Sequence, residues 1–250
     1  MDARTATAAR MTGRFDSSIS FEGLFSGRYR KPTVILILAP LIITTWKYFG
    51  SKHFYFIQFA DVFSINGNPA LTAELYTFVS AFLLMGVVPY LVIRFVFGES
   101  LVDYGVQIGD WSFGWKAFAV MAPVMVLLTI PSASMPDFIA EYPVYKGAGS
   151  SAGAFLFHAL SYLFFYLGWE MLFRGFMQFG LRGLGDWNAI LIQTSLSCIA
   201  HIGKPTGEIY SSILGALVWG IVVFRSRSLL YVLAVHWLLG VALDWFIVFG

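Results

Sequence analysis

Long apolar runs are the feature of this sequence that most constrains its fold. A helix that spans a bilayer needs about 20 mostly apolar residues. The chain has 250 residues and offers seven candidate spans, at roughly 17 or more residues each. They lie near residues 33–49, 75–97, 114–130, 154–180, 187–203, 209–225 and 229–249. The sequence therefore predicts an all-α, multi-pass transmembrane helical bundle with about seven spans.

The composition supports a chain that lies mostly in lipid. Charged residues make up 12% of the chain and the mean hydropathy is +0.73, whereas about 25% of a soluble domain is charged. A net charge of +2 and the lack of an aromatic platform beside a basic stripe exclude a nucleic-acid partner. The single cysteine, Cys198, excludes an intrachain disulfide. The expected partners are the lipid bilayer and a hydrophobic peptide or membrane protein, and the oligomeric state stays open.

Basic residues are distributed unevenly, and this predicts an orientation. Residues 1–31 form a basic tail without the apolar core of a signal peptide, and residues 32–250 form the predicted transmembrane domain. With a cytoplasmic N-terminus, seven spans place eleven Lys and Arg residues inside and four outside. The remaining one of the 16, Arg174, lies within the membrane. The inner set is Arg4, Arg10, Arg14, Arg28, Arg30, Lys31, Arg94, Lys116, Arg182, Arg225 and Arg227, and the outer set is Lys47, Lys52, Lys146 and Lys204. Because Lys and Arg concentrate on the cytoplasmic side of membrane proteins, we expect a cytoplasmic N-terminus.

Two charges interrupt the fourth apolar run. Glu170 and Arg174 lie in YLFFYLGWEMLFRG, residues 162–175, and at the bilayer centre each costs about 2.5–3.5 kcal/mol on insertion scales. Their i, i+4 spacing places both on one helix face. They form either a buried structural ion pair or a site in which the carboxylate activates water while the guanidinium fixes the position of the carboxylate.

Two histidines in later apolar runs are expected to meet this pair. At 1.5 Å per residue, Glu170, His201 and His236 lie about 18, 22 and 12 Å from their cytoplasmic turns, so all three can reach the inner or middle part of the membrane. A histidine on an apolar face is often only a satisfied core residue. Asp244 lies two turns beyond His236, and it either forms a structural hydrogen bond with this histidine or orients its imidazole.

Other polar residues are interpreted as structural. His158 lies about 120° around the fourth helix from Glu170. Lys204 and Glu208 are interpreted as ordinary charges of a connection, with a gate at the outer end of the site as the alternative. The stretch 131–153, with three prolines and the run GAGSSAG, is typical of a flexible loop. The sequence has no HExxH zinc motif. Its GLGD at 183–186 falls in a predicted turn, without the second aspartate of an aspartyl protease.

The segment Trp169–Gly175, WEMLFRG, resembles the CPBP family, which contains type II CAAX prenyl endoproteases and the Abi bacteriocin-processing or immunity proteins. The family signature is a Glu-Glu-x-x-x-Arg helix, then a Phe-x-x-x-His helix and a His-x-x-x-Asn helix. Residues 154–249 carry this order: Glu170 matches the second glutamate, Arg174 the arginine, and His201 and His236 the two histidines. The resemblance implies that the first glutamate and the second-motif histidine activate water, and that the third-motif histidine and asparagine stabilise the oxyanion.

The chain departs from the signature at three positions. Trp169 stands in place of the first glutamate, Ser197 in place of the phenylalanine, and Gly240 in place of the asparagine. An indole cannot accept a proton, so either Glu170 takes over as base or the protein has lost proteolysis. Asp244 is a candidate polar partner that partly replaces the asparagine.

From the residues and the resemblance we expect an intramembrane endopeptidase in a prokaryotic inner or plasma membrane. Glu170, helped by His201, would activate water for attack on a membrane-associated peptide, Arg174 would hold the carboxylate, and His236 would support the intermediate. No cofactor or metal is implied. A zinc site of Glu170, His201 and His236 is the lower-ranked alternative, because Arg174 would compete with a cation. The alternative function is a catalytically inactive CPBP-type binding or immunity protein. A proton-relaying transporter is a third possibility.

Overall fold

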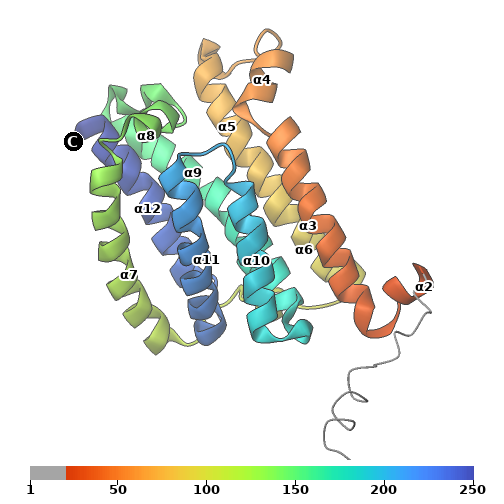
Figure 1. Ribbon diagram of the computed structural model, residues 1–250. Helices are drawn as coiled ribbons and strands as arrows, with labels where there is room; N and C mark the ends of the chain where they lie inside the picture. Colours follow the sequence, from red (N-terminus) through yellow and green to blue (C-terminus); the bar gives the residue numbers. More distant parts are fainter. Residues whose placement is uncertain (1–20) are drawn as a thin grey trace, which may run out of the picture.

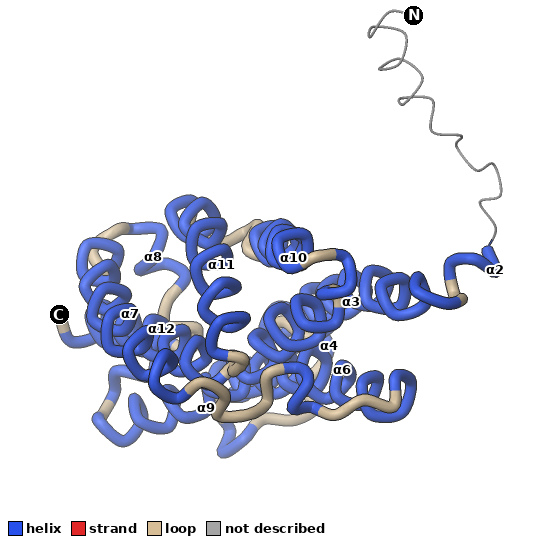
Figure 2. Tube along the Cα trace, turned by 90° about the horizontal axis from the view of Figure 1, so that it is seen from below, coloured by secondary structure: helices blue, strands red, loops and turns tan. Residues whose placement is uncertain are grey.

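The fold is a bundle of long helices, seen in a computed structural model that describes residues 21–250. No strand occurs among these residues (Figure 2), so the predicted all-α class is confirmed. Residues 1–20 of the predicted basic tail lie outside the described residues. The helices are α2 (Phe21–Leu24), α3 (Arg30–Phe49), α4 (Lys52–Gln58), α5 (Pro69–Ala81), α6 (Val88–Leu91), α7 (Trp111–Ser132), α8 (Pro136–Glu141), α9 (Ala152–Glu170), α10 (Asp186–Ala200), α11 (Thr206–Ser226) and α12 (Leu230–Phe249).

Six described helices are long and apolar enough to cross a membrane. They are Gly27–Phe49, Pro69–Phe97, Trp111–Ser132, Ala152–Phe179, Thr206–Ser226 and Leu230–Phe249. Each matches one of the seven predicted spans. Large apolar side chains on their outer faces are exposed, such as Leu127 at 63% and Leu214 at 69%, as expected for surfaces that contact lipid rather than water. The protein is therefore an integral membrane protein.

The remaining predicted span, 187–203, is the shorter helix α10. It has 15 residues, which corresponds to about 22 Å, less than the roughly 30 Å of a bilayer core. Figure 1 nevertheless shows α10 running beside α11 from one end of the bundle to the other. Residues 21–250 thus pass through the bundle seven times, with six passes of full membrane length.

The long segment Pro69–Phe97 and the fourth span each contain π-helical turns. These turns cover residues 82–87 and 92–97 around Pro89, and residues 171–179 directly after Glu170. Proline removes a backbone donor from the helix interior, and π-turns often mark functional sites. The two segments pack very closely where Gly168 of α9 meets α5, because a Cβ at Gly168 would lie 2.6 Å from the carbonyl oxygen of Ala81.

One end of the bundle carries most of the described arginines, and we call it the arginine end. Lys31 at the start of α3 is paired with Glu99 at 2.6 Å, and Arg225 at the end of α11 is paired with Asp110 at 2.8 Å. These pairs tie the start of α3, the loop 98–110 and the turn between α11 and α12 together. Asp186 at the start of α10 is paired with Arg182 at 2.9 Å.

The opposite end, which we call the lysine end, carries α4, α8 and the connection between α10 and α11 (Figure 1). Lys47 Nζ donates to the carbonyl oxygen of Ile202 at 2.6 Å. Lys204 Nζ lies 2.7 Å from Glu141 Oε1. These contacts fasten the connection between α10 and α11 onto α3 and α8, and so close this end around the site described next.

Candidate active site

The Glu170–Arg174 pair lies where α9 changes from α-helical to π-helical geometry. Arg174 Nη1 lies 3.2 Å from Glu170 Oε1, and the two side chains are 2% and 1% exposed. The predicted pairing on one helix face is thus present in the fold. Because a buried charge is tolerated only when it is paired, the pairing allows both side chains to lie inside the bundle.

His236 of α12 completes this buried cluster. Its Nδ1 lies 2.6 Å from Glu170 Oε1. Since an ionised carboxylate only accepts hydrogen bonds, Nδ1 carries the proton and Nε2 is the free ring nitrogen. The ring of His236 is held between those of Tyr166 and Trp219, with centroid distances of 4.6 and 4.4 Å. Glu170 therefore fixes both the tautomer and the orientation of His236.

A cavity of about 240 Å³, lined by both polar and apolar side chains, opens beside this cluster at the lysine end. The residues on its wall that bear on the chemistry are Tyr142, Tyr166, Trp169, His201, Glu208 and His236. Glu170 is not among the lining residues, and its Oε2 is buried without a partner. The cavity is large enough for several water molecules. Of the predicted site residues, His201 and His236 thus face the same cavity, while Glu170 and Arg174 lie behind His236.

His201 follows the last residue of α10 at the lysine end, outside the six membrane-length helices. Its Nδ1 lies 2.7 Å from the carbonyl oxygen of Ser197. A carbonyl only accepts, so Nδ1 carries the proton and Nε2 has the lone pair. Burial lowers the pKa of His201 to about 4, and the imidazole is therefore neutral at pH 7. A neutral ring with Nε2 unprotonated accepts hydrogen bonds from water.

Glu208 and Tyr142 are site residues that the sequence interpretation missed. Glu208 Oε1 lies 4.0 Å from His201 Nε2. The hydroxyl oxygen of Tyr142 lies 2.9 and 2.8 Å from the two carboxylate oxygens of Glu208, which share its single proton. Glu208 was interpreted as an ordinary charge of a connection, and Tyr142 falls in a stretch interpreted as a loop. The available signal was a carboxylate in the first turn of an apolar helix, a few residues after a motif histidine.

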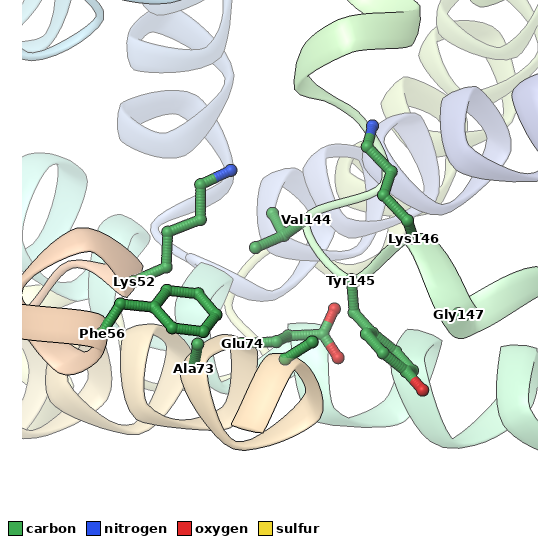
Figure 3. A pocket seen from close by; sticks show the side chains of 9 residues that line it. Lys52, Phe56, Ala73, Glu74, Val144, Tyr145, Lys146 and Gly147 are labelled. Carbon is green, nitrogen blue, oxygen red and sulfur yellow. The ribbon is translucent and has the colours of Figure 1, made fainter. Parts of the chain in front are cut away.

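Asp244 does not pair with His236, and that predicted pairing is wrong. Asp244 Oδ2 lies 2.7 Å from His158 Nε2, and Glu74 Oε1 lies 2.5 Å from His158 Nδ1, with all three side chains 0% exposed. The structural interpretation of His158 agrees with this arrangement. Glu74 also borders a smaller cavity of about 160 Å³, between Lys52 and Lys146 (Figure 3). The three residues join α5, α9 and α12 away from the larger cavity.

Two of the three departures from the family signature, at Trp169 and Gly240, have visible structural consequences, whereas Ser197 contacts His201 only through its backbone. The ring of Trp169 packs edge-on against His201 at 5.0 Å, and its Nε1 is buried without a partner. A Cβ on Gly240 would overlap the hydroxyl oxygen of Tyr166, so this hydroxyl occupies the place where the side chain of an asparagine would begin. The carbonyl of Ser197 accepts from His201.

The donors present do not fit the zinc site that was the lower-ranked alternative. Among residues 21–250, no three His, Cys, Asp or Glu side chains are grouped so that they could hold a metal ion. Glu170 Oε1 is already shared by Arg174 and His236, so this carboxylate is held by a guanidinium that would compete with a cation. The chemistry considered below is therefore that of the side chains themselves.

Fold and site together define a multi-pass helical membrane protein with a histidine-lined cavity backed by a buried Glu–Arg pair. Residues 151–242 match the family model for type II CAAX prenyl endopeptidase Rce1-like proteins. This segment of the chain is thus similar to that family, which confirms the predicted CPBP-type resemblance in the part that carries the motifs. Searches of curated proteins and of solved structures gave no match.

Proposed function

We propose that the protein is a membrane endopeptidase that hydrolyses a membrane-associated peptide or protein at the histidine-lined cavity. The observation that carries the proposal is the cavity wall itself, to which His201 and His236 both contribute from different helices. The match of residues 151–242 to an endopeptidase family supports the same reaction class. The substrate is a hydrophobic peptide that reaches the cavity from the bilayer.

In this proposal Glu170 acts through His236 instead of taking a proton from water. Its carboxylate is 1% exposed and bound to both Arg174 and His236, so water in the cavity does not reach it directly. His236, when doubly protonated, points an Nε2–H donor toward a developing oxyanion. Preorganised donors of this kind are worth about 2.7–4 kcal/mol each in acyl transfer. Arg174 balances the charge of Glu170.

Tyr166 supplies the second oxyanion donor in place of the asparagine of the family signature. Its ring lies against His236 at 4.6 Å, and its hydroxyl occupies the space beside Gly240. Both residues line the cavity. A phenolic O–H donates one hydrogen bond, so the pair can hold an oxyanion as the signature pair His–Asn would. His201, neutral and with Nε2 free, binds the attacking water.

We further propose that the cavity opens on the side of the membrane away from the cytoplasm. The arginine end is cytoplasmic by the positive-inside rule, and the cavity opens at the lysine end, in a prokaryotic inner or plasma membrane. A cysteine introduced at Lys204 should react with a membrane-impermeant maleimide in intact cells, while one introduced at Arg182 should not. The opposite labelling pattern would overturn this orientation.

The test of the proposed function is cleavage of a membrane-peptide library by the full-length protein in proteoliposomes. We expect cleavage at a rate that chelators change by no more than about twofold. His201→Ala and His236→Ala should each lower kcat by about 100-fold or more, as removal of an acid–base or oxyanion group does. His53→Ala on the exposed face of α4 is the matched control and should cleave as the parent does. Cleavage abolished by chelators and restored by zinc would contradict the metal-free reaction.

One observation favours an inactive binding or immunity protein as the second candidate. Trp169 fills the position of the first glutamate and packs on His201, which narrows the space for water on that side. If the parent is inert and Trp169→Glu alone creates cleavage, the parent is an inactive member of the family and binds its peptide without cutting it.

A further inference from the structure

The cavity needs a carboxylate that the family signature no longer supplies. At the signature position stands Trp169, whose indole has one N–H donor and no acceptor. Glu170, the neighbouring carboxylate, is buried behind His236 and shares its Oε1 with Arg174. If the cavity hydrolyses peptides as proposed above, its base has to come from another element of the fold.

Two other glutamates line the cavity, Glu141 and Glu208. Glu141 of α8 forms an ion pair with Lys204 at 2.7 Å, which holds its carboxylate on an ammonium group. Glu208 of α11 is held by the neutral hydroxyl of Tyr142, and its side chain is 23% exposed. Of the two, Glu208 alone combines access from the cavity with a position beside a signature histidine.

The spacing between Glu208 and His201 suits a single water molecule. Oε1 and Nε2 are 4.0 Å apart, which is too far for a direct hydrogen bond. A water that donates two bonds of about 2.8 Å, at an angle of about 105°, places its two acceptors about 4.4 Å apart. Both atoms accept, because the carboxylate is an acceptor and His201 Nδ1 already carries the proton. A water held in this way directs its oxygen lone pairs away from both groups.

We propose that Glu208 is the catalytic base of this protein, taking the place of the missing first glutamate. With His201 it holds the attacking water, and Tyr142 fixes its carboxylate through the two hydrogen-bond contacts. The carboxylate thus comes from the first turn of α11 and meets the same histidine from another side. This inference rests on the proposed peptidase function and adds to it the residue that activates water.

The reaction balances with the groups present. Glu208 takes one proton from water, and the oxygen of the resulting hydroxide bonds to the carbonyl carbon of the scissile peptide. The carbonyl π electrons move onto its oxygen, to which Tyr166 and the doubly protonated form of His236 donate hydrogen bonds. Collapse of the intermediate breaks the C–N bond, and the carboxylic acid of Glu208 returns its proton to the leaving nitrogen. The products are a carboxylic acid and an amine, and Glu208 is again ionised.

The experiment uses the full-length protein in proteoliposomes with a peptide from the library. Glu208→Gln keeps the size of the side chain and an oxygen for Tyr142 but removes the base. We expect kcat to fall by about 100-fold to 10,000-fold, the range for loss of general-base catalysis, with KM changed by less than about threefold. The matched control is Asp186→Asn, which neutralises an exposed carboxylate paired with Arg182 at the arginine end, outside the cavity, and should stay within about threefold of the parent. A thermal-unfolding midpoint of Glu208→Gln close to that of the parent shows that the variant is folded.

A second variant makes the result specific. Adding Trp169→Glu to Glu208→Gln returns a carboxylate to the signature position beside His201, and we expect it to recover at least about tenfold in kcat. Tyr142→Phe, which frees the carboxylate of Glu208, should lower kcat by a smaller factor than Glu208→Gln. Cleavage by Glu208→Gln at the rate of the parent overturns the role of Glu208 and leaves the peptidase function standing. An inert parent, tested with the whole library, overturns both.

Discussion

The buried cluster of Glu74, His158 and Asp244 makes a strong prediction about stability. His158→Phe keeps an aromatic ring among its neighbours Phe78 and Tyr162 but removes both ring nitrogens. Glu74 and Asp244, each 0% exposed, then lose their partner together. Each already has one carboxylate oxygen without a partner, so no alternative bond is present to replace the one that is lost.

The magnitude follows from the cost of breaking buried pairs. Removing one partner of a buried pair costs about 3–5 kcal/mol, because it leaves an uncompensated charge. Here one substitution breaks two such contacts, so a loss of at least about 3–5 kcal/mol is expected. For a chain of this size that corresponds to a fall in Tm of about 6–20 °C.

Thermal unfolding of the purified protein in detergent measures this effect. The matched control is His53→Phe on the exposed face of α4, which should leave Tm unchanged within about 1 °C. Adding Glu74→Gln and Asp244→Asn to His158→Phe removes the two charges and should restore part of the loss, since replacing a whole buried ionic group is much less costly than breaking it. A Tm for His158→Phe within about 2 °C of the parent would refute the reasoning.

Two further predictions concern the cavity mouth and its wall. Burial acts to raise the pKa of Glu141, but the charge of Lys204 outweighs it, and the pKa lies below its usual value. The contact with Lys204 therefore stabilises the fold at pH values above the usual pKa of a glutamate. That contribution is lost as the pH falls through the lowered pKa, and the Tm difference between the parent and Glu141→Gln should shrink from about pH 5 downward; a difference that grows in acid contradicts this sign. Gly240→Ala should lower Tm, because its Cβ overlaps the Tyr166 hydroxyl and overpacking costs about 1–3 kcal/mol. Gly215→Ala, whose Cβ meets nothing within 4 Å, should raise Tm slightly, and an equal response of the two variants would contradict the packing argument.

Much of the fold was predictable because membrane-length apolar runs leave few alternatives. Six predicted spans correspond to the six long helices, and the seventh is present as the 15-residue helix α10. Its length was hard to predict because the apolar run continues past the last helical residue, Ala200, into the turn at His201 and Ile202. The run shows where apolar side chains lie, whereas α10 itself ends at Ala200, before the turn in which Lys47 binds the carbonyl of Ile202.

The candidate site was predictable only where its contacts lie along one helix or follow the motif order. The spacing of Glu170 and Arg174 gave their pairing, and the motif order placed His236 near them. The rotation of α12 relative to α9 is set by tertiary packing, and it cannot be predicted from the sequence of either helix alone. Asp244 lies two turns from His236 along the chain, yet packing turns it toward His158, 86 residues away. The angular position of Asp244 on α12 therefore could not identify His158 as its partner.

Because packing between helices decides which side chains face the cavity, a residue at a motif position in this chain need not have the chemical role that the family signature gives to that position. Glu170 occupies the position of a motif glutamate, but its buried carboxylate orients His236 and does not face the cavity. Glu208 lies outside the motifs, 66 residues from Tyr142, and reaches the cavity because α8 and α11 meet at the lysine end. Water activation depends on which acceptors face the same space, whichever helix carries them. A histidine retained at one motif position can thus work with a carboxylate supplied by a different helix, provided that the helix ends in the same cavity.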